Sequence, residues 1–323
     1  MERYVYSGSL TREMHDILKN MPGFEPLNIL VTQVDRSGVK QAIEYKKEGF
    51  CKWFFLDSGA FSIHTGKAKT TLDEYASFIN SIDEYIDVCA ELDTIPGKFG
   101  VPKTHEDYVE SAKKSWDAFL ELRSKVKSPK KVMPVFHFGE DFSALRNMLE
   151  WKDENGDHLD YIGISPANDA NQMEKNIYMG EVAEVISKSS NPDVKTHLYG
   201  MTSLDALSKY PCYSADSISH RLIAAYCKIF SEHFGVISIT KKQRTSGHKN
   251  DLSFFETADD HNLNILRQEV EAVGLTFEQL QDNPSARVAF NMYNIQKVVG
   301  SGGKYEYKPT NLCRQKRLFS IDD

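Results

Sequence analysis

Tyr210-Pro-Cys-Tyr-Ser-Ala-Asp-Ser-Ile-Ser-His-Arg221 is a short apolar run that ends in a carboxylate and passes directly into a helical pattern. A buried strand that leads straight into a helix is the repeating unit of α/β folds. An Asp in front of a helix is often only its N-cap, so Asp216 alone has a structural explanation. An acid at the mouth of a buried strand is also costly to leave unpaired, which makes a chemical role the alternative.

The same strand-to-helix unit recurs along the chain. The apolar runs are continuous rather than alternating, which is typical of parallel strands buried on both faces. Eight such units predict a (β/α)8 TIM barrel of the α/β class. An open doubly wound sheet is the alternative, but its glycine-rich first turn, GxGxxG, is absent. We expect strands at residues 27–32, 53–57, 85–91, 131–137, 159–165, 195–199, 212–216 and 235–240, and helices at residues 10–19, 38–48, 72–82, 104–125, 142–151, 172–189, 203–209 and 219–232.

The pattern changes near residue 240. Helical segments at residues 262–273, 276–281 and 285–299 are followed by a basic tail. No low-complexity linker separates these segments from the barrel. We therefore expect a catalytic barrel over residues 1–240 and a helical, basic C-terminal extension over residues 241–323 that packs on the barrel.

Composition is that of an ordinary soluble globular protein, with 41% hydrophobic and 26% charged residues in a chain of 323. The apolar runs fall far short of the ~20 residues of a membrane span, and the N-terminus is not a signal peptide. We expect a cytoplasmic protein with no membrane partner, and a homodimer is possible. The five cysteines are scattered without a CxxC pair, which argues against a disulfide framework and against a metal site.

A net charge of −7 makes attraction of nucleic acid by the whole surface unlikely, but it does not exclude a local patch. Residues 241–249 and 314–317 are two such basic patches. Solvated basic loops are the simpler interpretation of both.

Polar groups stand where the expected strands end, and in a barrel those ends meet at one mouth. Each group alone has a structural explanation, such as a turn, a core histidine or a bend. Together they predict a site. The groups are Asp57, Ser58 and Gly59, then Asp93, His137, Gly163, Ser165, Tyr199, Gly200 and Asp216.

Three carboxylates without metal spacing and without a Gly-x-Ser-x-Gly elbow favour chemistry at an acetal carbon, where one acid attacks and another moves protons. Glycosyl transfer or hydrolysis fits this set. Phosphoryl transfer fits poorly, because it requires a phosphate cradle and Mg²⁺.

Four segments carry a resemblance to a known family. Leu56-Asp-Ser-Gly-Ala-Phe61 resembles the DSGGF motif of tRNA-guanine transglycosylases, and Asp87-Val-Cys-Ala-Glu-Leu-Asp-Thr-Ile-Pro96 resembles their segment with an Asp before a Pro-containing loop. His197-Leu-Tyr-Gly-Met-Thr-Ser-Leu-Asp-Ala-Leu207 is similar to the family's LMGVGTPEDL stretch, and Tyr213-Ser-Ala-Asp216 stands where its nucleophilic Asp does. The order and spacing agree over residues 27–221.

Departures from the family pattern point to one branch. The four-ligand zinc site is absent, the Pro-Thr-Arg continuation after the nucleophile is missing, and His137 replaces the Gln of the fourth strand. These changes resemble the phage-encoded 7-deazaguanine DNA transglycosylases, which implies DNA as the polymer and the host cytoplasm as the location.

The resemblance implies a role for each site residue. Asp216 attacks C1′ of a guanosine sugar, and Asp57 is the general acid/base. Asp93 accepts hydrogen bonds from the amidine edge of the base. The Gly163 backbone and His137 meet the opposite edge, with Ser58 and Gly200 also at the base, and Phe61 and Tyr199 sandwich its ring. A 7-deazaguanine such as preQ0 then takes the sugar, and no cofactor is needed.

Three other functions stay open. The first is a transglycosylase that carries out the same exchange on tRNA. The second is a base-excising glycosidase, in which water rather than a second base resolves the intermediate. The third is a barrel without catalytic activity that only binds nucleic acid. Phosphate contacts are expected from Arg221, Lys241, Lys242, Arg244 and Lys249.

Replacing Lys241, Lys242 and Arg244 together by alanine is expected to weaken nucleic-acid binding. The slope of log K against log salt should fall by about 2–3, because three phosphate contacts are lost. Fluorescence anisotropy with labelled DNA at several salt concentrations measures this slope. An unchanged slope identifies the segment as a solvated loop.

Overall fold

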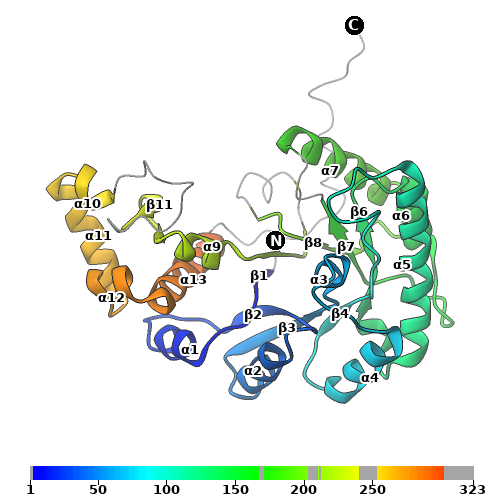
Figure 1. Cartoon of the computed structure of the whole chain (residues 1–323), viewed down its shortest axis with the longest axis horizontal. Coiled ribbons are helices and arrows are strands. Elements are labelled where there is room, and N and C mark those ends of the chain that lie inside the picture. Colours follow the sequence, from blue (N-terminus) through cyan, green and yellow to red (C-terminus); the bar gives the residue numbers. More distant parts are fainter. Residues whose placement is uncertain (1–2, 167–170, 203–209, 211, 240–252, 302–323) are drawn as a thin grey trace, which may run out of the picture.

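The computed structural model describes residues 3–166, 171–202, 210, 212–239 and 253–301. In this part of the chain, nine parallel strands form a nearly closed barrel with helices around it (Figure 1). The strands run in the order β5-β4-β3-β2-β1-β9-β8-β7-β6. They are β1 (Arg3–Ser7), β2 (Leu27–Thr32), β3 (Cys51–Asp57), β4 (Val88–Ala90), β5 (Val132–Met133), β6 (Val135–His137), β7 (Tyr161–Ser165), β8 (Lys195–Leu198) and β9 (Ser214–Ser217). The predicted TIM-barrel-like α/β fold is confirmed.

The two ends of this order, β5 and β6, are successive parts of one run that Pro134 interrupts. Proline has no N–H to donate to a strand ladder. β5 pairs with β4 on one side of the break, and β6 pairs with β7 on the other. The buried Glu91 side chain bridges the break, because its Oε1 accepts the N–H of Val135 at 2.7 Å. If β5 and β6 count as one position, the barrel has the eight positions of a TIM barrel.

Helices follow the strands and cover the outside of the barrel (Figure 1). Local capping explains where several of them begin. Thr71 and Glu74 form a capping box in which each side chain accepts the other's backbone N–H, as their spacing predicts. The helix predicted at residues 203–209 lies outside the described residues. The outer helices are α1 (Arg12–Lys19), α2 (Arg36–Lys47), α4 (Leu72–Ile82), α5 (His105–Lys125), α6 (Phe142–Glu150), α7 (Gln172–Ser187) and α9 (Ser219–Ala225). The short α3 (Ala60–His64) follows β3 at the open end of the barrel.

One predicted barrel strand is wrong, and one real strand escapes prediction. The described part of the strand predicted at residues 235–240 does not join the barrel, since β11 (Gly235–Ser238) pairs antiparallel with β10 (Lys228–Ser231). The place beside β9 is taken by β1, which pairs with both β9 and β2. β1 has only five residues, and polar Arg3 and Ser7 flank a run of just three apolar or aromatic residues, so it lacks the longer apolar pattern of the predicted strands.

The helix predicted at residues 219–232 is also too long. It ends at Ala225, and Cys227 takes a left-handed backbone conformation with φ 56°. That conformation is unfavourable for a residue with a side chain, and it breaks the helix before β10.

The C-terminal helices follow the β10–β11 hairpin, and the last of them packs on the barrel. They are α10 (Phe254–Thr257), α11 (Asp260–Ala272), α12 (Phe277–Asp282) and α13 (Pro284–Ser301). α13 contacts β1, α1 and α9, and the hydroxyl of Tyr6 donates to the carbonyl of Met292 at 2.9 Å. The extension therefore supplies the helix that covers β1 from outside.

The barrel interior is filled at its centre, so open space remains only at an end. A compact apolar cluster occupies the inside: Val5, Leu30, Trp53, Phe55, Val88, Ala90 and Met133, with Tyr161 and Tyr199 packed against it. This packing is the usual filling of a TIM barrel. Within the described residues, no helix is both long and apolar enough to cross a membrane.

Substitution of Asn291 tests how α13 is attached to the rest of the protein. Its buried side chain accepts the N–H of Phe230 at 2.7 Å and donates to the carbonyl of His220 at 3.0 Å. Asn291→Ala leaves both backbone groups unpaired, so we expect a loss of about 2–4 kcal/mol in unfolding free energy. Urea denaturation measures it, and Asn264→Ala on the exposed side of α11 is the control. Equal stability of the two variants contradicts this attachment.

Candidate active site

A cavity of about 770 Å³ opens at the carboxyl ends of the barrel strands. Asp57, Asp93 and Asp216 all line it, although they lie far apart in the sequence. The shared cavity is what the strand ends predict for a barrel. Other residues around it are Phe61, His137, Ser165, Tyr199 and Gly200.

Asp216, in β9, is held by donors from three directions. Its Oδ1 accepts the Gly200 N–H at 3.1 Å and faces His197 Nε2 at 3.3 Å, and its Oδ2 accepts the hydroxyl of Ser7. Burial raises the pKa of Asp216, but the hydrogen bond and the charge of His197, together with the hydrogen bonds from Ser7 and Gly200, outweigh burial and hold the pKa below its ordinary value. Asp216 is therefore ionised and oriented at neutral pH.

Asp57, at the end of β3, has the opposite electrostatics. Burial is the largest effect, and the charge of Asp93 adds to it, so the pKa of Asp57 rises to about 7. The Gly59 N–H, at 3.0 Å from Oδ2, and the charge of Asp216 have smaller and opposing effects. A carboxyl group with a pKa near 7 can both give and take a proton under physiological conditions.

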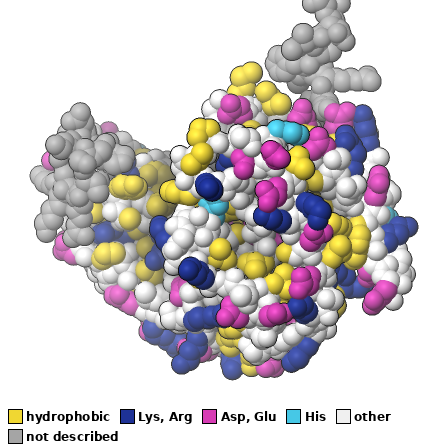
Figure 2. Space-filling view, turned by 45° about the vertical axis from the view of Figure 1, so that its right-hand side comes forward, with side chains coloured by type: hydrophobic (Ala, Val, Ile, Leu, Met, Phe, Trp, Pro, Cys, Tyr) yellow, Lys and Arg dark blue, Asp and Glu magenta, His cyan; other side chains and the backbone are white. Residues whose placement is uncertain are grey.

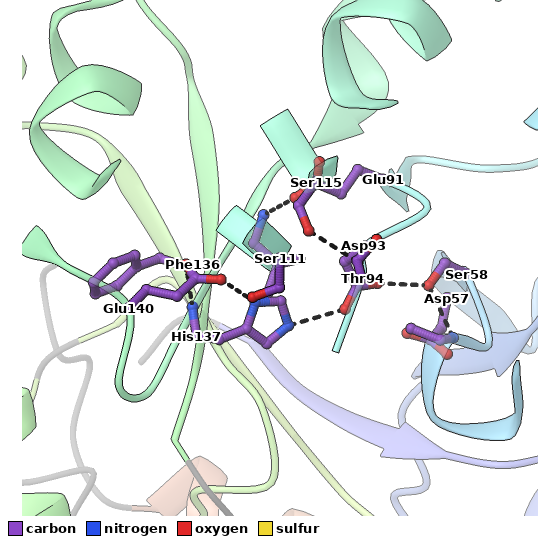
Figure 3. A network of polar contacts seen from close by, with 12 residues as sticks. Asp57, Ser58, Glu91, Asp93, Thr94, Ser111, Ser115, Phe136, His137 and Glu140 are labelled. Carbon is purple, nitrogen blue, oxygen red and sulfur yellow. Dashed lines mark hydrogen bonds and ion pairs between the residues drawn. The ribbon is translucent and has the colours of Figure 1, made fainter. Parts of the chain in front are cut away.

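Asp93 lies between Ser58 and His137 (Figure 3). The Ser58 hydroxyl donates to Oδ1 at 2.8 Å, and His137 Nε2 lies 2.9 Å from Oδ2. On its other side, His137 Nδ1 lies 3.2 Å from Glu140 Oε1. Burial lowers the pKa of His137, but the hydrogen bonds to Asp93 and Glu140 raise it to about 10. His137 is thus an imidazolium between two carboxylates.

The structure adds to two sequence expectations. His137 lines the cavity, and its side chain is paired directly with that of Asp93. Gly163 is not among the residues that line the cavity, and its N–H donates to the Pro134 carbonyl at 2.8 Å. A Cβ at residue 163 would lie 2.9 Å from Cε2 of Tyr199. Gly163 therefore provides the space in which the Tyr199 ring lies.

Ser58 and Gly200 each donate a hydrogen bond to one of the acids. The fully buried Ser58 donates to Asp93, and the Gly200 N–H donates to Asp216. Gly200 has φ 64°, a conformation that favours glycine. The two residues predicted as base contacts thus fix the directions of two carboxylates.

The Tyr199 hydroxyl is buried, and no hydrogen-bond partner for it is found in the described part of the chain. Burial raises the pKa of Tyr199 well above its usual range, and the charges of Asp57, Asp93 and Asp216 add to this effect. The phenol therefore stays protonated beside all three acids. Its ring lies 4.6 Å from His197, edge to face.

The mouth of the cavity combines exposed aromatic and basic side chains, of which sequence reasoning identified Phe61 but missed Phe99, Lys98 and Lys103. Phe61 and Phe99 are 56% and 64% exposed, and their ring centroids are 6.4 Å apart. Lys98 and Lys103, on the loop that follows Asp93, also line the mouth. The only sequence signal for this loop is its position after a strand end, since its composition is unremarkable.

Of the predicted phosphate contacts, Arg221 lies among the described residues, and it does not line the cavity. Arg221 points toward the end of β1, where its Nη1 lies 3.5 Å from the Ser9 carbonyl. Lys241, Lys242, Arg244 and Lys249, with the basic residues 314–317, fall outside the described residues. In the ranges the structure describes, no group of three or more His, Cys, Asp or Glu is arranged to hold a metal ion.

Ser7, His197 and Glu140 are further site residues that the sequence did not reveal. Ser7 was hidden because β1 was not predicted, and His197 is a buried residue inside a strand. A scan against protein-family models finds no match to the chain, and a search of curated proteins finds no similar one.

The raised pKa of Asp57 gives stability a specific pH dependence. The unfolded carboxyl ionises near pH 4, but the folded one stays protonated to about pH 7, so stability is lost as pH rises between these values. Asp57→Asn removes this loss. We therefore compare the unfolding free energy of the variant with that of the wild type at each pH. The variant's advantage over the wild type should be larger at pH 8 than at pH 4, by up to about 4 kcal/mol.

Chemical denaturation at several pH values measures the difference. Asp141→Asn is the matched control, since hydrogen bonds to Ser143 lower the pKa of that exposed carboxyl and the pH trend is reversed. A difference between Asp57→Asn and wild type that does not change with pH contradicts the raised pKa.

Proposed function

We propose that the protein is a pentosyltransferase that exchanges guanine in DNA for a 7-deazaguanine base through a covalent glycosyl intermediate on Asp216. One observation carries this proposal: Asp57 and Asp216 line one cavity with pKa values shifted in opposite directions. Two carboxyl groups whose environments separate their pKa values are the usual arrangement for an acid/base and a nucleophile.

In the first half-reaction, a carboxylate oxygen of Asp216 forms a bond to C1′ as the C1′–N9 bond breaks. The electron pair of that bond leaves with the guanine, which takes the proton of Asp57. This order suits the two groups, because Asp216 is ionised and Asp57 holds a proton at pH values below about 7.

The second half-reaction reverses these steps with the incoming base. Asp57, now a carboxylate, takes the N9 proton of the 7-deazaguanine, and N9 attacks C1′. The C1′–O bond to Asp216 breaks, and its electron pair returns the carboxylate. No redox change occurs, so the cycle balances without a further reactant.

Asp93 and Tyr199 support recognition of a flat heterocycle. Among the described residues, Asp93 Oδ1 accepts one hydrogen bond, from Ser58, and Oδ2 accepts one, from His137. Each oxygen therefore keeps a lone pair for an N–H donor of the base. The Tyr199 ring and Phe61 line the same cavity and offer aromatic faces for stacking. We assign Asp93 to the amidine edge and Tyr199 to the ring.

The cavity mouth supports a polymeric substrate. Exposed Phe99 with Lys98 and Lys103 is the mixture of aromatic and basic groups that suits a single-stranded or flipped nucleotide. On the face drawn in Figure 2, acidic, basic and hydrophobic side chains lie interspersed, without a single large patch of one sign. Attraction would therefore be local. The choice of DNA over tRNA depends on the sequence departures after Asp216 and at His137.

Two assays decide among the functions. Incubation with preQ0 and either DNA or tRNA, followed by mass spectrometry of the digested nucleosides, identifies the polymer and the inserted base. Release of free guanine without insertion identifies a base-excising glycosidase. Binding without release or insertion leaves only a nucleic-acid-binding barrel, and it refutes the exchange activity.

Asp216→Asn keeps the shape of the side chain but removes the nucleophilic charge. We expect the rate of exchange to fall by on the order of 10³-fold or more, because the covalent route is lost. Ser143→Ala, on the outer helix α6, is the control for handling and folding. A folded Asp216→Asn variant with near-normal exchange removes Asp216 from the mechanism.

A further inference from the structure

We propose that the loop between β4 and α5 binds the nucleotide next to the exchanged one, with the neighbouring base stacked on Phe99 and its phosphates held by Lys98 and Lys103. This segment, residues 94–103, is called the mouth loop below. The strand it takes must be unpaired at the target and at that neighbour. The inference rests on the proposed function for the identity of the exchanged base, whereas the binding surface is a property of the loop.

Both ends of the mouth loop are fixed on α5. At its start, the Thr94 N–H donates to the buried hydroxyl oxygen of Ser115 at 2.9 Å (Figure 3). At its end, Thr104 begins α5 with a capping box. The neck of the loop is narrow, because a Cβ on Gly97 would lie only 3.2 Å from Cγ of Lys103. The tip of the loop is therefore carried on a fixed frame.

The tip of the mouth loop is a tight turn that exposes Phe99. The Val101 N–H donates to the Lys98 carbonyl at 3.1 Å, so residues 98–101 form the turn. Gly100 occupies the third position with φ 78°, the positive φ that a type II turn requires there. Phe99 occupies the second position and is 64% exposed. The backbone thus holds a large apolar ring out in water at the cavity mouth.

Phe99 is one of three rings that lie together at this mouth. Its ring centroid is 6.4 Å from that of Phe61 and 6.2 Å from that of His64, and both contacts are nearly perpendicular. Burial and the charge of Lys103 lower the pKa of His64, so its imidazole is uncharged at neutral pH. Exposed apolar groups gathered in one patch mark a binding surface. An unpaired base is a flat group that stacks on such rings.

Depth separates Phe99 from the acids that the proposed function assigns to the target base and its sugar. The side chains of Asp93 and Asp216 are only 10% and 12% exposed. The cavity of about 770 Å³ lies in the range of sites that take ligands of several rings, so one base leaves it partly open. A base that reaches Asp93 therefore lies below Phe99, and the group that meets Phe99 is the next nucleotide of the strand.

Lys98 and Lys103 supply the charge that suits a phosphate backbone. Lys98 precedes Phe99 in the turn, Lys103 lies at the neck of the loop, and both line the cavity. Within the described residues, no hydrogen bond or ion pair joins either lysine to a carboxylate, so both ammonium groups are available to a ligand. Exposed rings beside free cations are the combination that binds single-stranded nucleic acid.

A binding cycle that removes either the ring or the neighbouring base tests this contact. Fluorescence anisotropy compares wild type and Phe99→Ala on labelled single-stranded DNA with one guanine, and on strands that lack the base at the guanine or at either neighbour. Phe99→Ala should weaken binding of the intact strand by on the order of 5- to 100-fold, the effect of losing one stacked base. Loss of the base at one neighbour should weaken wild-type binding by a similar factor and Phe99→Ala binding much less.

Salt dependence tests the lysines and checks that the loop keeps its shape. Replacing Lys98 and Lys103 together by alanine should lower the slope of log K against log salt by about 1.4, because each phosphate contact on a single strand contributes ~0.7. Phe99→Ala removes no charge and should leave the slope unchanged. Leu120→Ala truncates an exposed apolar side chain on α5 and is the matched control, which should bind as the wild type does.

Three results overturn the inference. The first is an equal loss of affinity in wild type and Phe99→Ala when either neighbouring base is removed. The second is coupling of Phe99 to the guanine itself, which places the ring in the base site. The third is a salt slope that the double lysine substitution does not change. None of these measurements needs turnover. Wild-type protein with the expected coupling but no exchange refutes the proposed function alone, so the two failures are distinguishable.

Discussion

Three carboxylates in one partly closed cavity repel one another, and the arrangement of the barrel mouth follows from how that repulsion is relieved. Asp57 keeps its proton and so carries no charge, and the charge of Asp93 is balanced by the His137 imidazolium. Asp216 stays ionised because Ser7, His197 and the Gly200 N–H donate to it. Each acid is thereby given a different charge state or a different partner, and different chemistry becomes possible at each.

Those three solutions depend on strands that are distant in sequence but adjacent in the barrel. Ser7 reaches Asp216 because β1 pairs with β9, the first barrel strand with the last. That pairing is in turn covered from outside by α13, near the end of the described chain. The nucleophile's environment therefore depends on both ends of the fold. Separating the C-terminal helices from the barrel would uncover the strand that carries Ser7.

The break at Pro134 shows a similar dependence at the opposite side of the barrel. The run from Val132 to His137 changes its pairing partner at the proline, and the Glu91 side chain accepts the N–H of Val135 that follows it. Burial raises the pKa of Glu91 well above its usual range, so this carboxyl adds no charge beneath Asp93. The same break places His137 where it meets Asp93. A backbone interruption thus contributes to the electrostatics of the cavity.

The sequence by itself determined the barrel class and the position of Asp57, Asp93 and Asp216 at strand ends, because continuous apolar runs followed by helices report parallel strands locally. It missed β1, whose apolar run is only three residues long, and it assigned residues 235–240 to a place that β1 occupies. Only the tertiary structure decided which acid holds a proton, that His137 pairs with Asp93, and that Gly163 makes room for Tyr199. These properties arise from burial and from charges brought together by strand pairing, and no local pattern encodes them.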